Sequence, residues 1–215
     1  VIKEANAGLL SMVEITAIKT ELGEYVPMDM DVSPFDNSKT HKEAVGRTYK
    51  GMDGYAPNFA YIGAEGYMLN CELRPGTQHC QKGTPEFLRE TFALLKKAAT
   101  KHAVLLRMDA GNDAWENVRL CRAAGIHYLI KRNLRREKLE DWLGIARIYG
   151  EAHEPRIGKT VYRGSCTRFM DDGAGNQEPW RIVFEVTERS ITRKGQHLLI
   201  PELEVDTYWT DLDEH

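Results

Sequence analysis

Two apolar segments of the sequence each carry an aspartate near their carboxyl end. Residues 26–33 contain Asp29-Met30-Asp31, and residues 103–109 end on Asp109. Aspartate is depleted in strands because its side chain competes for the backbone and resists burial. Two carboxylates on neighbouring strands are suitable ligands for hard divalent cations such as Mg²⁺ or Mn²⁺. The chemistry that this pattern indicates is two-metal phosphoryl transfer.

Plainer interpretations exist for each of these residues. Asp109 alone could cap a helix, and Asp31 alone could be a charge on an edge strand. The two together, one on each strand, favour the metal site. A zinc site built from Cys71, His79 and Cys80 is a weaker hypothesis, because ligand number and spacing are both poor for zinc. We therefore read the four widely spaced cysteines as reduced thiols.

The bulk composition is that of a globular chain. It has 215 residues, 42% hydrophobic and 28% charged, which suits one large domain or one domain with an insertion. No apolar run is long enough to cross a membrane, and the first residues lack the apolar core of a signal peptide. We expect a cytoplasmic protein, cut from a longer chain because no initiator Met is present.

The charge is unevenly distributed along the sequence. Residues 201–215 hold six acids and no Lys or Arg, which leaves 26 acids against 29 bases in the remainder. Within that remainder lies a basic cluster made of Lys131, Arg132, Arg135 and Arg136. Such a cluster could track a phosphate backbone, although clusters of this size are more often a solvated helix start.

The order of the expected elements indicates the fold class. Hydrophobic patterns and turn signals predict three antiparallel strands, a helix, and then strand–helix–strand–helix. The segments are 24–33, 58–63, 66–73, the helix from Thr84, 103–109, the helix after Asp113, 127–130 and 136–148. This is the order of a ribonuclease H-like α/β fold, with a mixed five-stranded sheet flanked by helices. In that fold Asp31 and Asp109 lie on adjacent strands, and Asp29 shares the face of Asp31.

We expect four parts along the chain. A β-rich insertion follows Gly150 and precedes the last core strand, because short alternating strands and a glycine-rich loop replace the helical pattern there. The parts are 1–23, the end of an N-terminal helical region and linker; 24–150, the first part of the catalytic core; 151–206, the insertion; and 207–215, the last core strand.

Four segments resemble the DDE transposases of bacterial insertion sequences. They are residues 29–38 (DMDVSPFDNS), 49–57 (YKGMDGYAP), 78–84 (QHCQKGT) and 130–136 (IKRNLRR). The resemblance covers essentially the whole chain and is most specific in residues 24–137. It implies a ribonuclease H-like core, an Asp–Asp–Glu triad and, when the site is complete and DNA-bound, two Mg²⁺ or Mn²⁺ ions.

The resemblance assigns the first two carboxylates. The family's first Asp is followed after one residue by Ser or Thr, which selects Asp31, with Ser33 behind it, and leaves Asp29 as its substitute. Asp109 is the second. The family's Glu lies on a helix beyond the strand at 207–210, but the chain stops at His215 and Glu214 is too close to that strand. We therefore expect no third acidic residue in this chain, and a fragment that does not cleave DNA by itself.

The function implied is that of a transposase catalytic core, which cleaves transposon ends and transfers strands. Its partners would be double-stranded DNA at the ends and target and, at full length, a second copy of the chain, with no membrane; it would act at the bacterial nucleoid. Candidate phosphate contacts, each of which could instead be a solvated charge, are Lys50, Arg107, Lys131, Arg132, Arg135 and Arg136. Two alternatives remain open: a nuclease of the same fold without strand transfer, and a non-catalytic DNA-binding module.

Overall fold

The computed structural model describes residues 1–171 and 175–213, and these fall into two compact units. One unit is Val1–Ile130 together with the residues from Leu212 onward, and the other is Lys131–Asp211. Within the described residues, no helix combines the length and the apolar character needed to span a membrane.

The first unit contains a mixed sheet, a small second sheet and three α-helices. The helices are α1 (Ile2–Leu10), α2 (Thr84–Ala98) and α3 (Trp115–Ala124), and a 3₁₀ turn, η1 (Ala110–Asn112), precedes α3. The strands are β1 (Ile18–Thr20), β2 (Gly23–Val32), β3 (Phe35–Asp36), β4 (Gly46–Arg47), β5 (Asp53–Tyr55), β6 (Asn58–Ile62), β7 (Tyr67–Glu72), β8 (Ala103–Met108) and β9 (His127–Lys131).

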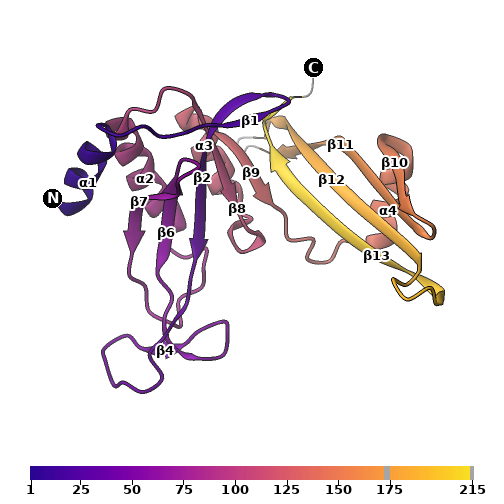
Figure 1. Ribbon diagram of the computed structural model, residues 1–215, viewed down its shortest axis with the longest axis horizontal. Helices are drawn as coiled ribbons and strands as arrows, with labels where there is room; N and C mark the ends of the chain where they lie inside the picture. Colours follow the sequence, from indigo (N-terminus) through magenta and orange to yellow (C-terminus); the bar gives the residue numbers. More distant parts are fainter. Residues whose placement is uncertain (172–174, 214–215) are drawn as a thin grey trace. The chain divides into compact units, whose positions relative to one another are not determined.

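The main sheet of this unit has the strand order β7-β6-β2-β8-β9 (Figure 1). Strand β2 is antiparallel to β6 and parallel to β8, while β8 is parallel to β9 and β6 is antiparallel to β7. The short strand β1, which the sequence did not predict, pairs with the start of β2. The mixed α/β sheet expected from the sequence is therefore present, and β2 lies at its centre.

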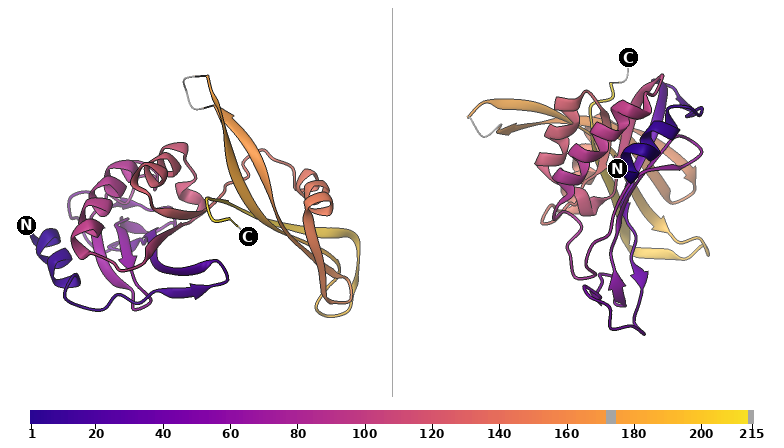
Figure 2. Two further views of the ribbon diagram at one scale, coloured as in Figure 1. Left: turned by 90° about the horizontal axis from the view of Figure 1, so that it is seen from above. Right: turned by 90° about the vertical axis from the view of Figure 1, so that its left-hand side faces the viewer.

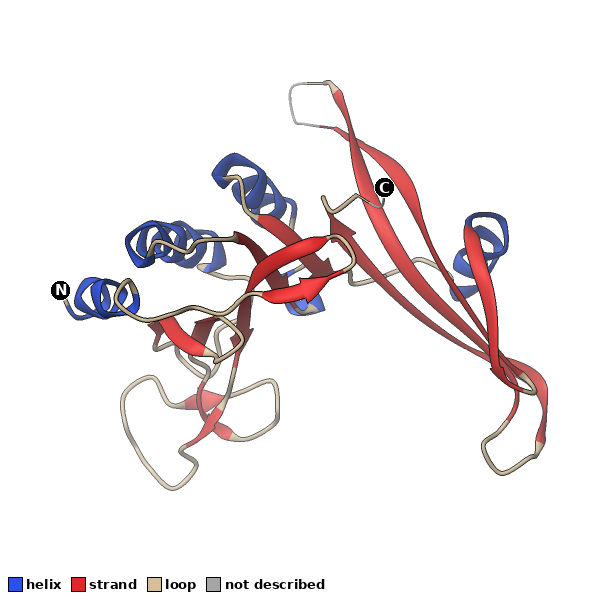
Figure 3. Cartoon of the chain, turned by 45° about the horizontal axis from the view of Figure 1, so that its top comes forward, coloured by secondary structure: helices blue, strands red, loops and turns tan. Residues whose placement is uncertain are grey.

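Alternation along β2 separates an apolar face from a polar one. Val26, Met28 and Met30 are buried, whereas Asp29 and Asp31 are exposed. Helices α1, α2 and α3 lie in a row on one face of the sheet (Figures 2 and 3). The buried methionines belong to the core beneath these helices, because successive residues of a strand point to opposite faces. The two aspartates consequently stand on the other face.

The buried stripe of α2 explains why this helix forms. Its buried apolar residues recur at helical spacing and are Phe87, Leu88, Phe92, Leu94, Leu95 and Ala98. The helix begins at Thr84, and Gly83 with φ 76° takes the N-cap position. Glycine suits this left-handed backbone, which costs other residues free energy.

The polar segment 34–55 contains the second sheet. Strand β5 lies between β3 and β4, and we call residues 33–57 the arm (Figure 1). The strands approach so closely that a Cβ on Gly54 would lie 1.8 Å from the Phe35 carbonyl oxygen. A Cβ on Gly76 would lie 2.1 Å from the Gly54 oxygen. Glycines thus pack the arm directly against the chain that follows β7.

The second unit is an antiparallel sheet with one helix. Its elements are α4 (Leu139–Tyr149), β10 (Gly150–Arg156), β11 (Lys159–Asp171), β12 (Gln177–Ile191) and β13 (His197–Thr210). The four strands pair in sequence order. Helix α4 packs on this sheet, with the ring centroids of Trp142 and Phe184 6.0 Å apart.

Strand β13 differs from the sequence expectation. Short alternating strands were expected up to residue 206, followed by a separate strand at 207–210. The structure has one continuous strand, His197–Thr210, across this region. Pro201 lies near an irregularity in the pairing with β12, between Arg189 and Ile191. Proline is tolerated at such bulges because it lacks the N–H needed for regular pairing, so it did not break the strand.

Candidate active site

The structure brings Asp31 and Asp109 to adjacent positions on neighbouring strands. In the parallel pairing of β2 with β8, Asp29 is opposite Arg107 and Met30 is opposite Met108. Asp31 follows Met30 and Asp109 follows Met108. Strand alternation therefore puts Asp31 and Asp109 on the same face as Asp29 and Arg107. Two carboxylates are therefore neighbours at the carboxyl ends of parallel strands.

The two carboxylates influence each other electrostatically. Partial desolvation raises the pKa of Asp31 above its usual value, and the negative charge of Asp109 raises it further. A hydrogen bond from the Val32 N–H and the positive charge of Lys50 act in the opposite direction. A like-charge pair of this kind is relieved by a bound cation.

Each aspartate has one oxygen held and one oxygen without a partner in the described part of the chain. Asp31 Oδ1 accepts a hydrogen bond from the Val32 N–H at 2.7 Å. Asp109 Oδ1 accepts from the Gly111 N–H at 3.1 Å and from Asn112 Nδ2 at 2.9 Å. The two Oδ2 atoms have the donor chemistry that Mg²⁺ and Mn²⁺ prefer. Residues 1–171 and 175–213 contain no cluster of three or more His, Cys, Asp or Glu side chains placed to hold a metal.

Asp29 is engaged differently, although it shares the face of Asp31. Arg107 Nε donates to Asp29 Oδ1 and Nη2 donates to Oδ2, both at 2.6 Å. Hydrogen bonding to Asp29 raises the pKa of Arg107. This bidentate pair occupies both oxygens of the residue considered as a substitute for Asp31. It also gives Arg107, a candidate phosphate contact, a carboxylate partner within the sheet.

The tip of the arm reaches this site. The chain turns at 48–52, with the Thr48 N–H and hydroxyl both bonded to the Met52 carbonyl and Gly51 at φ 79°. The Tyr49 hydroxyl donates to the Val32 carbonyl at 3.2 Å, beside Asp31. Partial desolvation raises the pKa of Tyr49, and the charges of Asp31 and Asp109 add to this effect. Lys50 is exposed, and its charge acts on Asp31, so the structure places this predicted phosphate contact next to the carboxylates.

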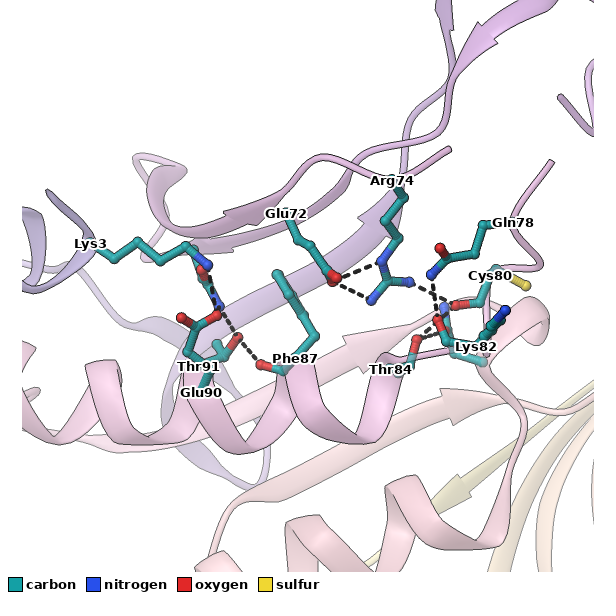
Figure 4. Close-up of polar contacts among 12 residues, drawn as sticks. Lys3, Glu72, Arg74, Gln78, Cys80, Lys82, Thr84, Phe87, Glu90 and Thr91 are labelled. Atoms are coloured by element: carbon teal, nitrogen blue, oxygen red, sulfur yellow. Dashed lines mark hydrogen bonds and ion pairs between the residues drawn. The ribbon is translucent and has the colours of Figure 1, made fainter. Parts of the chain in front are cut away.

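The loop before α2 reaches the site from the other direction. Cys80 Sγ donates to the Gly111 carbonyl at 3.0 Å, and burial raises the pKa of this thiol, with the Asp109 charge contributing. Arg74, only 1% exposed, holds the loop by donating to the Cys80 carbonyl at 3.0 Å and pairing with Glu72 (Figure 4).

Sequence reasoning missed Tyr49, Cys80 and Asn112 as neighbours of the carboxylates. Tyr49 and Cys80 lie in two segments, 49–57 and 78–84, that were quoted only for their resemblance. Their proximity to Asp109 depends on the arm and the loop before α2, which carry no periodic pattern. Asn112 could have been noticed as an amide three residues after Asp109, at a helix start.

The structure contradicts the prediction that Arg132 is a phosphate contact. Arg132 is 6% exposed, and its guanidinium lies over the rings of Trp209 and Trp142, at 4.5 and 5.4 Å from their centroids. Its Nη2 donates to Glu137 Oε1 at 2.6 Å. A buried, stacked cation of this kind holds the second unit together and does not face solvent. The error arose because four basic residues close in sequence were treated as equally exposed.

The other members of the basic cluster differ in their surroundings. Lys131 pairs with Asp206 at 2.5 Å, and that hydrogen bond raises the pKa of Lys131. Arg135 and Arg136 are exposed, and Arg135 has a positive φ of 52°. The exposed part of the cluster is therefore smaller than the sequence indicated.

Comparison with known proteins adds three findings. A family model described as "Transposase DDE domain group 1" matches residues 5–187. No curated protein matches the chain. Among solved structures, a piggyBac transposase in a synaptic complex with hairpin DNA is similar, with a TM-score of 0.41 and 12% sequence identity. That match covers 88% of this chain and 34% of the piggyBac chain, so the chain spans about a third of its length.

Proposed function

The chain belongs to the family of transposase DDE domains, group 1, and from this premise we propose that its first unit is the catalytic core of a DNA transposase. The specific activity proposed is metal-dependent phosphoryl transfer, with cleavage of transposon-end DNA followed by strand transfer. The motifs that resemble insertion-sequence enzymes support a parent element of the bacterial insertion-sequence type, acting on DNA in the cytoplasm at the nucleoid and as a homodimer at full length.

One observation carries this proposal: Asp31 and Asp109 are neighbours at the carboxyl ends of the parallel strands β2 and β8. The strand order β7-β6-β2-β8-β9, in which β6 alone runs opposite to the other four strands, supports the ribonuclease H-like assignment of the fold. The expected domain division, with 24–150 as the core and 151–206 as an insertion, remains part of the proposal.

In this proposal, different residues of the chain bind the metal and the DNA. Asp31 and Asp109 would hold the divalent cations through their Oδ2 atoms, and Arg107 keeps Asp29 neutralised beside them. Bound Mg²⁺ or Mn²⁺ supplies activation of the attacking hydroxyl and stabilisation of the leaving oxygen. Lys50 on the turn at the tip of the arm would bind a phosphate oxygen of the DNA. Arg135 and Arg136 would contact other phosphates of the DNA backbone.

A third carboxylate is part of the chemistry implied by the family. The described residues bring two carboxylates to the site, and Glu214, already set aside on sequence grounds, lies outside them. We therefore propose that this chain alone binds DNA and metal but does not cut. Mg²⁺ usually needs substrate phosphates in addition to one or two protein carboxylates, so DNA is expected to strengthen metal binding.

The test is binding and cleavage of a labelled duplex that carries the ends of the parent element. The expected result for the chain is DNA binding that Mg²⁺ strengthens, with the metal effect lost in Asp31→Asn and Asp109→Asn. A protein that also supplies the family's third carboxylate is expected to nick the duplex in the presence of metal, and both substitutions should abolish nicking. Cleavage that survives both substitutions would place the chemistry elsewhere. Nicking without joining to an added target would favour the nuclease alternative.

A further inference from the structure

We propose that Asn112 is a positioning residue for Asp109, and that it fixes which carboxylate oxygen is offered to the divalent cation. This role deepens the function proposed above and rests on it. Asn112 is fully buried, and its side-chain amide donates to Asp109 Oδ1 at 2.9 Å. The Gly111 N–H donates to the same oxygen at 3.1 Å.

Two donors on one oxygen restrict the rotation of the carboxylate. Hydrogen bonds to an ionised acceptor are among the stronger ones in proteins, and these two converge on Oδ1 from the turn η1. Oδ2 is then the oxygen of Asp109 that has no partner in the described residues. The orientation of the Asn112 amide follows from the chemistry of its partner, since an ionised carboxylate only accepts and must face the NH₂ group.

The position of Asn112 is itself held by a buried amide network. Its main-chain carbonyl accepts from Asn117 Nδ2 at 2.8 Å, and its main-chain N–H donates to the Asp109 carbonyl at 3.1 Å. Asn117 is also fully buried, and Nδ2 donates in addition to Gln81 Oε1 at 2.8 Å. The amide network therefore connects Asp109 with α3 and with the loop that carries Cys80.

Thr84 makes a weaker contribution to the network. Its Oγ1 lies 3.4 Å from Asn112 Oδ1 and 2.7 Å from the Cys80 carbonyl. A hydroxyl has a single hydrogen, and the shorter contact takes it. Asn112 is consequently held mainly through its main chain and through Asp109. Its side-chain NH₂ group donates to the Asp109 carboxylate.

A second buried asparagine in the same unit provides the matched control. Asn70 is 2% exposed, and its Nδ2 donates to Thr91 Oγ1 at 3.0 Å and to Glu90 Oε2 at 3.1 Å (Figure 4 shows the latter two residues). Replacement of Asn70 by Ala removes buried hydrogen bonds, as replacement of Asn112 does. It removes no group near Asp31 or Asp109. Comparing the two separates a positioning role from a general loss of stability.

The experiment measures Mn²⁺ binding to the 215-residue chain by the loss of the free-ion electron paramagnetic resonance signal. Thermal unfolding is followed in parallel by circular dichroism. We expect Asn112→Ala and Asn112→Leu to weaken Mn²⁺ binding about tenfold, as the loss of a partner that orients a metal ligand does elsewhere. Asn70→Ala should lower the unfolding temperature and leave Mn²⁺ affinity within about twofold of the wild type.

The outcomes distinguish this role from the proposed function. Folded Asn112 variants that bind Mn²⁺ as tightly as the wild type would overturn the positioning role and leave the metal site intact. Binding that is unaffected by Asp31→Asn and Asp109→Asn would overturn the metal site, and the positioning role with it. If neither Asn112 variant folds, Asn117→Ala is used; a loss of about threefold is expected, and unchanged affinity would again count against the role.

Discussion

Arg107 and Asp29 form a bidentate ion pair across β8 and β2, with both N–O distances at 2.6 Å. This pair distinguishes two aspartates that lie two residues apart on one face of the same strand. Asp29 has both oxygens committed to a guanidinium, whereas Asp31 has only a main-chain N–H on Oδ1. Asp31 therefore keeps an oxygen for a cation that Asp29 lacks, and the assignment of Asp31 as the metal ligand stays a prediction.

Substitution of the two aspartates should therefore affect metal binding unequally. Asparagine keeps the shape of the side chain but loses the negative charge that holds a hard cation. Asp31→Asn should weaken Mn²⁺ binding by more than about tenfold, and Asp29→Asn should leave it within about threefold. Titration of each variant with Mn²⁺ measures this, and equal losses would show that the Arg107 pair does not remove Asp29 from the site.

The charge of Asp31 should also reduce the stability of the metal-free protein. The pKa of Asp31 is raised in the folded protein, so the folded state binds the proton more tightly than the unfolded state does. The stability that this group contributes is present at low pH and is lost as the pH rises through its raised pKa. Asp31→Asn should therefore increase the unfolding temperature at pH 7, by about 1–2 °C because solvent screens the side chain.

Two measurements check the cause of that increase. The difference between Asp31→Asn and the wild type should disappear as the pH falls below 3.8, the ordinary aspartate value. At pH 7, added Mn²⁺ should stabilise the wild type and not the variant, because a ligand stabilises the state that binds it. An increase that persists at low pH would indicate a packing effect instead of the removal of a charge.

The sequence predicted the elements that carry the aspartates because their patterns are strong and local. The alternation of Val26, Met28 and Met30 with Asp29 and Asp31 is visible without a structure, and so is the apolar stripe of α2. The glycines at 63 and 66, with φ of 80° and 73°, mark the turn between β6 and β7 as expected. Sequence order then sufficed to place β2 beside β8.

The rest of the fold and of the site depends on contacts between distant residues, which leave no local pattern in the sequence. The arm has a loop-like composition, and its three short strands exist because Gly54 and Gly76 allow backbones to approach closely. Arg132 has the same local character as Arg136, but the rings of Trp142 and of the distant Trp209 cover it. Periodicity reports which face of an element is apolar, but not which far residue will cover a charge.

Lys50 should act on both Asp31 and DNA. Its positive charge lowers the pKa of Asp31, so Lys50→Met should raise that pKa further. Loss of one phosphate contact should also reduce the slope of log affinity against log salt for duplex DNA by about one. The Asp31 pKa is read from the NMR titration of its carboxyl carbon, and DNA affinity is read from fluorescence anisotropy at several salt concentrations.

Lys39 is the matched control for Lys50, since it is an exposed lysine of the same arm. Its charge acts on Asp36, whose pKa is lowered chiefly by hydrogen bonds from Ser38. Lys39→Met should leave the Asp31 titration unchanged. An Asp31 titration that is the same in Lys50→Met and in the wild type would mean that the tip of the arm does not lie at the carboxylates in solution.

Arg132 and Arg136 should show opposite behaviour although they are four residues apart. Arg132→Ala removes a cation held between Trp142 and Trp209 and a hydrogen-bond donor to Glu137. Burial alone would raise the pKa of Glu137, but hydrogen bonds that include Arg132 hold it below its usual value. We expect the unit Lys131–Asp211 to lose about 2–4 kcal/mol of unfolding free energy.

Arg136→Ala should instead change the free energy of unfolding by less than about 0.5 kcal/mol, because the side chain is exposed. It should reduce the salt slope of DNA binding by about one if Arg136 contacts a phosphate. Urea unfolding of both variants gives the stability, and fluorescence anisotropy gives the slope. The assignment of Arg132 as a structural cation requires that its variant, under conditions where it is fully folded, keeps the wild-type slope. A reduced slope in folded Arg132→Ala, with Arg136→Ala unchanged, would reverse the two roles.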